Sequence, residues 1–302
     1  MELLEIRKGK SMSYNRWISA DPNTIAYRIF KKHHCEINDY LWSYIPLESF
    51  GSYIVRNEKE KNIHELFFVG GPDAKRVYTE RHKWKKDIEN FSKWTNINVL
   101  VSILSYFEFY MKRICYTAIM SDPGLIIGAS RAVDGTINLK NNIEIPIDVY
   151  VGRITKGTWF DRANNFEHLF KWIPDSINKN LNILDNMRVI RNRAAHAFGR
   201  NLSDVFIEKH DDMPMDSLKL RQLKSFMSLV DDITTEIDEH LLNNHIGEFE
   251  LIHLLHKNKN KLHGFNNEKA RQIKKLLNAS RVGNSRNIDF CEQLVEYYYN
   301  IK

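Results

Sequence analysis

Hydrophobic residues recur at steps of three and four over residues 94–120, which is the spacing of one face of an α-helix. Glu108 lies at the edge of this face, where it can pair with a basic residue of another helix. Pro123 and Gly124 follow, so we expect the helix to end there. Charged residues interrupt the apolar run, which therefore predicts a packed helix and not a membrane span. The predicted buried face consists of Leu100, Ile103, Leu104, Phe107, Met111, Ile114 and Ala118.

The same period returns further along the chain. Residues 161–172 suit a short helix, and Pro174 stands near the start of a longer one that Gly199 is placed to end. A fourth helix is expected at about residues 216–243, and residues 247–302 are also helical in pattern. The pattern predicts a mainly α protein. The apolar stripe of the fourth helix consists of Leu223, Phe226, Val230, Ile233, Ile237 and Leu241.

Two regions break the helical pattern. In the mixed region 1–75, residues 51–57 and 64–71 resemble short strands. Residues 125–160 contain strand-like runs and several glycines, which predicts a small β-rich insertion within the helical core. The chain is accordingly expected to comprise an N-terminal mixed region of unknown role (1–75), a helical bundle with this insertion (76–245) and a basic helical C-terminal region (246–302).

Composition narrows the class of protein. A hydrophobic content of 43% and an aromatic content of 12% exclude a disordered or fibrous chain. The net charge of +6 favours an anionic partner without identifying it. Segments 75–93 and 247–302 each carry an excess of four positive charges, which serves either as a solvated surface or as a contact for RNA or a protein partner.

Cysteine usage and the N-terminal residues bear on localisation. Cys35, Cys115 and Cys291 lie far apart, without the spacing of a zinc site, which fits a reducing compartment. The first 17 residues lack the apolar core of a signal peptide. We therefore expect a cytoplasmic protein with no membrane partner.

The segment DNMRVIRNRAAHAFGR, residues 185–200, places many cations on one predicted helix. At 100° per residue, Asp185, Arg188, Asn192 and His196 share one side, here called the polar ladder. Arg191 stands at the border between this ladder and the apolar stripe, where an arginine is costly to bury without an anion. Either Glu108 or another acid neutralises Arg191 on an ordinary helix surface, or the ladder is a binding or catalytic site.

RNRAAH, followed by AFGR, resembles the defining motif of the HEPN superfamily, an Arg followed by a polar residue and then a His after a gap of four to six residues. Arg191, Asn192 and His196 match it. The apolar helix with Glu108, the WFDR stretch, the motif helix and the long fourth helix follow the order of the ribonuclease and phage-defence branch of that superfamily. The resemblance covers about residues 90–245 and implies a HEPN-like helical bundle.

The resemblance implies a metal-independent endoribonuclease, acting as a toxin or anti-phage effector. In that role His196 exchanges protons, Arg191 holds the phosphate, and Asn192 orients either of them. Arg188 and Arg200 are weaker candidates for neighbouring phosphates. The products are a 2′,3′-cyclic phosphate and a 5′-OH, because the nucleophile belongs to the RNA.

No cofactor and no metal are expected. The partners implied are the RNA substrate, a second copy that pairs helix 188–200 across a two-fold axis, and an antitoxin or other regulatory protein. A different class is a non-catalytic HEPN-type module that binds RNA or protein. The clusters at residues 33–36 and 210–212 are weak metal candidates, and no phosphate-binding glycine motif or nucleophile elbow occurs.

Overall fold

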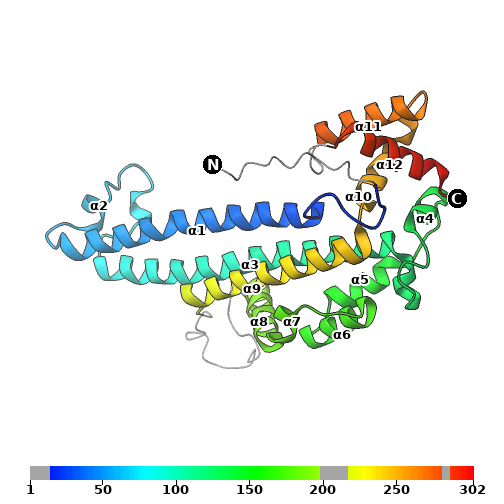
Figure 1. Cartoon of the computed structure of the whole chain (residues 1–302). Helices are drawn as coiled ribbons and strands as arrows, with labels where there is room; N and C mark the ends of the chain where they lie inside the picture. The colour runs from blue at the N-terminus through cyan, green and yellow to red at the C-terminus, as the bar shows by residue number, and fades with distance from the viewer. Residues whose placement is uncertain (1–13, 198–216, 281–285) are drawn as a thin grey trace, which may run out of the picture. The chain divides into compact units, whose positions relative to one another are not determined.

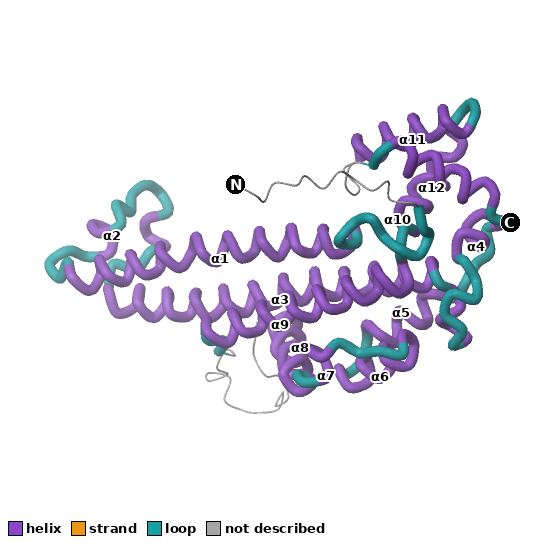
Figure 2. Tube along the Cα trace, viewed as in Figure 1, coloured by secondary structure: helices purple, strands orange, loops and turns teal. Residues whose placement is uncertain are grey.

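The computed structural model describes residues 14–197, 217–280 and 286–302. These residues form twelve α-helices and short 3₁₀ and π turns, with no strand among them, which confirms the mainly α prediction (Figures 1 and 2). The helices are α1 Ile25–Asn57, α2 Ile63–Leu66, α3 Arg81–Ser121, α4 Gly135–Asn141, α5 Ile147–Thr155, α6 Trp159–Phe170, α7 Asp175–Asn178, α8 Leu181–Ala197, α9 Leu220–Leu241, α10 Phe249–Asn258, α11 Asn266–Ser280 and α12 Ile288–Asn300.

The chain divides into two compact units, each assembled from separate segments. Unit 1 comprises Met1–Ile29, Phe109–Asn178 and Ile233–Lys302, and unit 2 comprises Phe30–Glu108 and Lys179–Asp232. The divisions fall inside α1, α3 and α9, so each of these helices contributes residues to both units. The boundaries expected near residues 75 and 245 stay a prediction.

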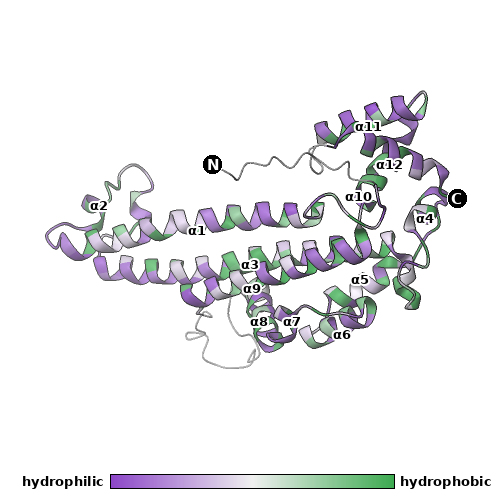
Figure 3. Ribbon diagram, viewed as in Figure 1, coloured by the Kyte–Doolittle hydropathy of each residue, from purple (hydrophilic) through white to green (hydrophobic). Residues whose placement is uncertain are grey.

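Unit 2 is built on the helical faces that the apolar period marks. Its parts of α3 and α9 bury those residues of the predicted stripes that belong to unit 2, and α8 adds Leu184 and Met187 to the core. Lys31 of α1 forms an ion pair with Asp231 of α9, and the Asn96 amide donates to the carbonyl of Leu218 at 2.9 Å. Figure 3 shows hydrophobic and hydrophilic positions interleaved along α3 and α9, as amphipathic helices require.

Unit 1 contains the last three helices, whose facing sides form one hydrophobic cluster with Leu255, Ile273, Leu277 and Leu294 among its members. The Lys and Arg residues of segment 247–302 that the structure describes are outside this cluster. Tyr110 of α3 is also buried here, and its hydroxyl donates to the carbonyl of Thr234 at 2.9 Å. Among the described helices, none has the length and apolar composition that a membrane crossing requires.

The apolar stripes predicted on the first and fourth helices are confirmed, since every residue named in them is buried. The helix expected over 94–120 starts earlier, at Arg81, and ends at Ser121 as predicted. The helix expected from Pro174 is two helices, α7 and α8. Gly199, its expected end, lies outside the described residues.

The strand predictions were wrong. Residues 51–57 complete α1, and residues 64–71 contain the end of α2 and a turn. The β-rich insertion expected at 125–160 consists of a 3₁₀ turn followed by α4, α5 and the start of α6. Ile147, Val151 and Ile154 of α5 are buried at steps of four and three, so the period is helical. Their β-branched side chains raise strand propensity without reversing that period.

Candidate functional site

The polar ladder lies on α8, an uninterrupted helix of 17 residues in unit 2 (Figure 1). Its first two members pair with each other. The Arg188 guanidinium donates from Nε and Nη2 to the two carboxylate oxygens of Asp185, at 2.8 and 3.0 Å. This forked contact raises the pKa of Arg188 and engages two of its nitrogens. Arg188 is therefore a weaker candidate for binding phosphate than an unpaired arginine would be.

Arg191 makes two contacts that bring three polar residues together. Its Nη2 donates to Glu108 Oε2 at 2.8 Å, and its Nη1 donates to Asn192 Oδ1 at 3.1 Å. The side chains of Arg191 and Glu108 are 29% and 26% exposed, so water and a ligand reach both of them. The predicted contact between the border arginine and Glu108 or another acid is confirmed, and it is the contact that the ordinary-surface alternative expects. The contact fixes the direction of the guanidinium and partly balances its charge.

The remaining members of the candidate site are only partly described. His196 belongs to α8, one helical turn after Asn192, and its side chain lies outside the described part of the structure. Arg200 lies outside the described residues altogether. The structure therefore brings together Arg191, Asn192 and Glu108, and it leaves the position of the His196 imidazole open.

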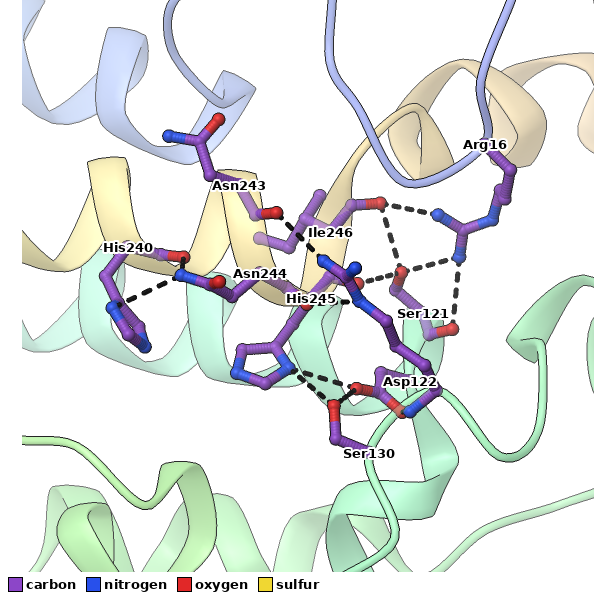
Figure 4. Close-up of polar contacts among 10 residues, drawn as sticks. Arg16, Ser121, Asp122, Ser130, His240, Asn243, Asn244, His245 and Ile246 are labelled. Carbon is purple, nitrogen blue, oxygen red and sulfur yellow. Dashed lines mark hydrogen bonds and ion pairs between the residues drawn. The ribbon is translucent and has the colours of Figure 1, made fainter.

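A second polar cluster, in unit 1, was not foreseen from the sequence. It surrounds the π turn Leu242–Ile246 at the end of α9 and is shown in Figure 4. Its members, here called the π-turn network, are Arg16, Ser121, Asp122, Ser130, Arg131 and His245. A π turn shifts the backbone hydrogen bonds of a helix and leaves carbonyl oxygens to be satisfied by other groups.

Two arginines supply the missing donors. Arg16 Nη1 donates to the Ile246 carbonyl at 2.8 Å, and its Nη2 donates to the Ser121 hydroxyl at 2.7 Å (Figure 4). Arg131 donates from Nε to the Asn244 carbonyl and from Nη2 to the Asn243 carbonyl, both at 3.0 Å. The π turn is thus held from two sides by charged donors.

Asp122, Ser130 and His245 have the residue types of a nucleophilic triad, and their geometry is different. His245 Nδ1 lies 3.0 Å from Asp122 Oδ2 and 3.4 Å from the Ser130 hydroxyl, which also donates to Asp122 Oδ2. A relay needs the serine and the carboxylate on opposite ring nitrogens, whereas here both approach Nδ1. Asp122 is fully buried and also accepts the backbone N–H of Arg131 at 2.7 Å. We interpret the cluster as a structural network.

His240 lies beside this network and is held by stacking. Its ring lies 3.8 Å from that of Trp172 with an interplanar angle of 6°. Burial lowers the pKa of His240 to about 4, with a further lowering from His245. At neutral pH the imidazole is uncharged, which suits a ring packed between aromatic neighbours.

Neither metal candidate gains support. His33 lies 3.2 Å from Glu36 and stacks on Tyr106, and no group of three or more potential ligands occurs among the described residues. Residues 210–212 lie outside that part of the chain. Comparison of the chain with protein-family models, curated protein sequences and solved structures finds no match.

Proposed function

We propose that this protein is a metal-independent endoribonuclease of HEPN type, acting as a toxin or anti-phage effector. The observation that supports it most is the arrangement around Arg191. Its guanidinium is held by Glu108 and Asn192, remains partly exposed, and precedes His196 on the same continuous helix. A guanidinium whose direction is fixed in advance loses little freedom when a phosphate binds, which favours its use in a site.

In this proposal the 2′-OH of the RNA attacks the adjacent phosphorus and the bond from phosphorus to O5′ breaks. His196 accepts the 2′ proton or donates a proton to O5′, and Arg191 stabilises the charge on the phosphorane. Two protonation roles need two imidazoles, so a second copy of α8 supplies the other one across a two-fold axis. A toxin of this kind would also need a regulatory partner, such as an antitoxin, to restrain it.

The test compares the wild-type protein with His196→Ala and Arg191→Met on mixed RNA in EDTA. We expect wild type to cleave and to leave 2′,3′-cyclic phosphate and 5′-OH ends. Each variant is expected to lose about a hundredfold or more in rate, because each removes a proton-transfer or charge-stabilising group. Arg193→Met, a neighbouring substitution on the same helix, is the matched control and should retain most of the activity.

The assembly is tested separately by sedimentation velocity. We expect a dimer, and we expect equimolar mixing of His196→Ala with wild type to reduce the specific activity in proportion to the mixed dimers formed. A monomer that cleaves at the full rate would contradict the composite site.

A second candidate function is a non-catalytic HEPN-type module that binds RNA or protein. The Glu108 carboxylate favours it, because a negative charge 2.8 Å from Arg191 competes with a phosphate for the same guanidinium. This module would bind RNA in a gel-shift assay without cutting it, and His196→Ala would leave that binding unchanged.

A further inference from the structure

A large cavity lies in unit 1, and no residue of the proposed cleavage motif lines it. It measures about 710 Å³ and is walled mainly by α3, α5 and α10, together with Ile25 at the start of α1. Sites for small molecules in proteins fall between roughly 300 and 1,000 Å³ and are lined mainly by apolar groups with a few convergent polar ones. The cavity therefore has the size of a small-molecule site.

Its walls are largely apolar and aromatic. Phe249 forms a buried part of the wall, whereas Phe109 and Tyr116 are exposed aromatic side chains that follow one another along α3. Burying large exposed aromatic side chains against another molecule is favourable, so their presence around a cavity indicates a binding site. An apolar ligand in the cavity would cover these exposed rings.

Gly152 gives an independent sign that the cavity takes a ligand. It lies inside α5, where glycine weakens a helix relative to alanine. It lines the cavity, and apart from its two chain neighbours and the backbone of its own helix no described atom lies within 4 Å of the position that a Cβ would take there. Packing against the protein therefore does not explain this glycine. A bare stretch of helix backbone on the wall leaves room for a ligand to approach closely.

The charges around the cavity indicate the sign of that ligand. Arg113 is half-buried, and among the described residues no hydrogen bond or ion pair engages its guanidinium. Burial raises the pKa of the neighbouring Glu250 to about 7, against opposing effects of the Ile25 N–H and of Arg113. That carboxyl accepts a hydrogen bond from the N–H of Ile25 at 2.9 Å. Because it is partly protonated at neutral pH, its negative charge balances the positive charge of Arg113 only in part. The charged side chains of the wall are Lys112, Arg113 and Lys156 against Asp148 and Glu250.

We propose that this cavity binds a small organic anion, with its apolar or aromatic body against Gly152 and the aromatic wall and its anionic group on Arg113. The proposal does not depend on the ribonuclease assignment, because none of its residues belongs to the cleavage motif. An arginine in an apolar wall is a strong anion recognition element, since its planar fork matches carboxylate, phosphate and sulfonate oxygens.

The experiment measures the affinity of two fluorescent probes of similar shape for the full-length protein. One is 1-anilinonaphthalene-8-sulfonate, which carries the anionic group, and the other is N-phenyl-1-naphthylamine, which is uncharged. We expect saturable binding of the sulfonate to the wild type. Arg113→Gln should lower the affinity for the sulfonate by about tenfold, because one charge-assisted contact is lost. The affinity for the uncharged probe should change by less than about twofold.

Gly152→Leu and Gly152→Ala form the matched pair for shape. The leucine side chain projects into the cavity and should weaken both probes by about tenfold or more, whereas alanine should retain most of the binding. Circular dichroism and thermal unfolding verify that each variant folds. If the leucine variant does not fold, the affinities of the two probes for Arg113→Gln test the proposal on their own. Binding that neither substitution changes, or an equal loss of both probes in Arg113→Gln, would overturn the proposal.

Discussion

The polar side of α8 and the π-turn network use the same kinds of side chain, arginine with carboxylate, in different surroundings. Arg191 of α8 and Glu108 of α3 have side chains that are more than a quarter exposed, and their contact fixes the direction of the guanidinium without removing either group from water. In the π-turn network Asp122 is fully buried and Arg16 is almost so, and each makes several hydrogen bonds. The comparison teaches that residue types alone do not distinguish these two regions. The exposure of the side chains and the geometry of their partners do.

The largest difference between the two regions is expected in the free energy of unfolding when one carboxylate is removed from each. Asp122→Ala leaves the Arg131 N–H, the Ser130 hydroxyl and His245 without their buried acceptor. We expect the free energy of unfolding to fall by about 3 kcal/mol or more. Asp185→Ala removes a partly exposed partner of Arg188 and should cost about 1 kcal/mol or less.

Urea unfolding followed by circular dichroism measures both variants under the same conditions. A similar small loss in the two would show that the π-turn network is no more important for stability than the surface of α8. A loss of RNA cleavage in Asp122→Asn at unchanged stability would instead make this region part of the active site.

A second difference concerns pH and arises from Glu248, a buried residue beside the π turn. Burial raises its pKa to about 7, while the Ala20 N–H, Arg286 and Arg16 oppose the rise and Asp21 adds to it. The unfolded carboxyl loses its proton near pH 4.5, so between about pH 4.5 and 7 the native state holds more protons than the unfolded state. The contribution of Glu248 to stability is therefore present at low pH and is lost as the pH rises through 7.

Glu248→Gln keeps an oxygen that accepts the Ala20 N–H and removes the ionisation. We expect the variant to match wild type near pH 5 and to be more stable near pH 8, by an amount on the order of 2 kcal/mol. Thermal unfolding at the two pH values measures it. The exposed Glu296→Gln on α12 is the control, and a variant that is destabilised equally at both pH values would contradict the assignment.

The periodic part of the fold is what sequence reasoning recovers best. The buried stripes of α3 and α9 follow directly from the helical period, because each helix packs one continuous face. Residues 125–160 were misassigned because isoleucine and valine dominate short runs there, and local propensity outweighed a helical period that spans only a few turns.

The polar clusters also differ in how far the sequence predicts them. Glu108 and Arg191 both stand at the borders of apolar stripes, so the helical period predicted that Glu108 or another acid meets Arg191, and the structure identifies the acid as Glu108. The pairing of Asp122 with His245 joins residues 123 positions apart, and the sequence marks Asp122 only as part of a helix stop. The unit 1 cavity draws its walls from helices that lie far apart in the chain, and the β-rich insertion predicted for residues 125–160 did not place Gly152 inside a helix.

The smallest expected effect is the coupling between Arg191 and Glu108. A double-mutant cycle with Arg191→Met and Glu108→Gln should give an interaction energy of about 0.5 kcal/mol, because partly exposed ion pairs are screened by water and hold two long side chains in one geometry. Lys31→Met with Asp231→Asn, an ion pair of similar exposure in the same unit, is the matched cycle. A coupling near 3 kcal/mol would show that Arg191, like the buried Arg16, serves mainly to stabilise the fold. A small coupling means that Glu108 orients the guanidinium without competing strongly with a phosphate, which is what the cleavage proposal requires of this ion pair.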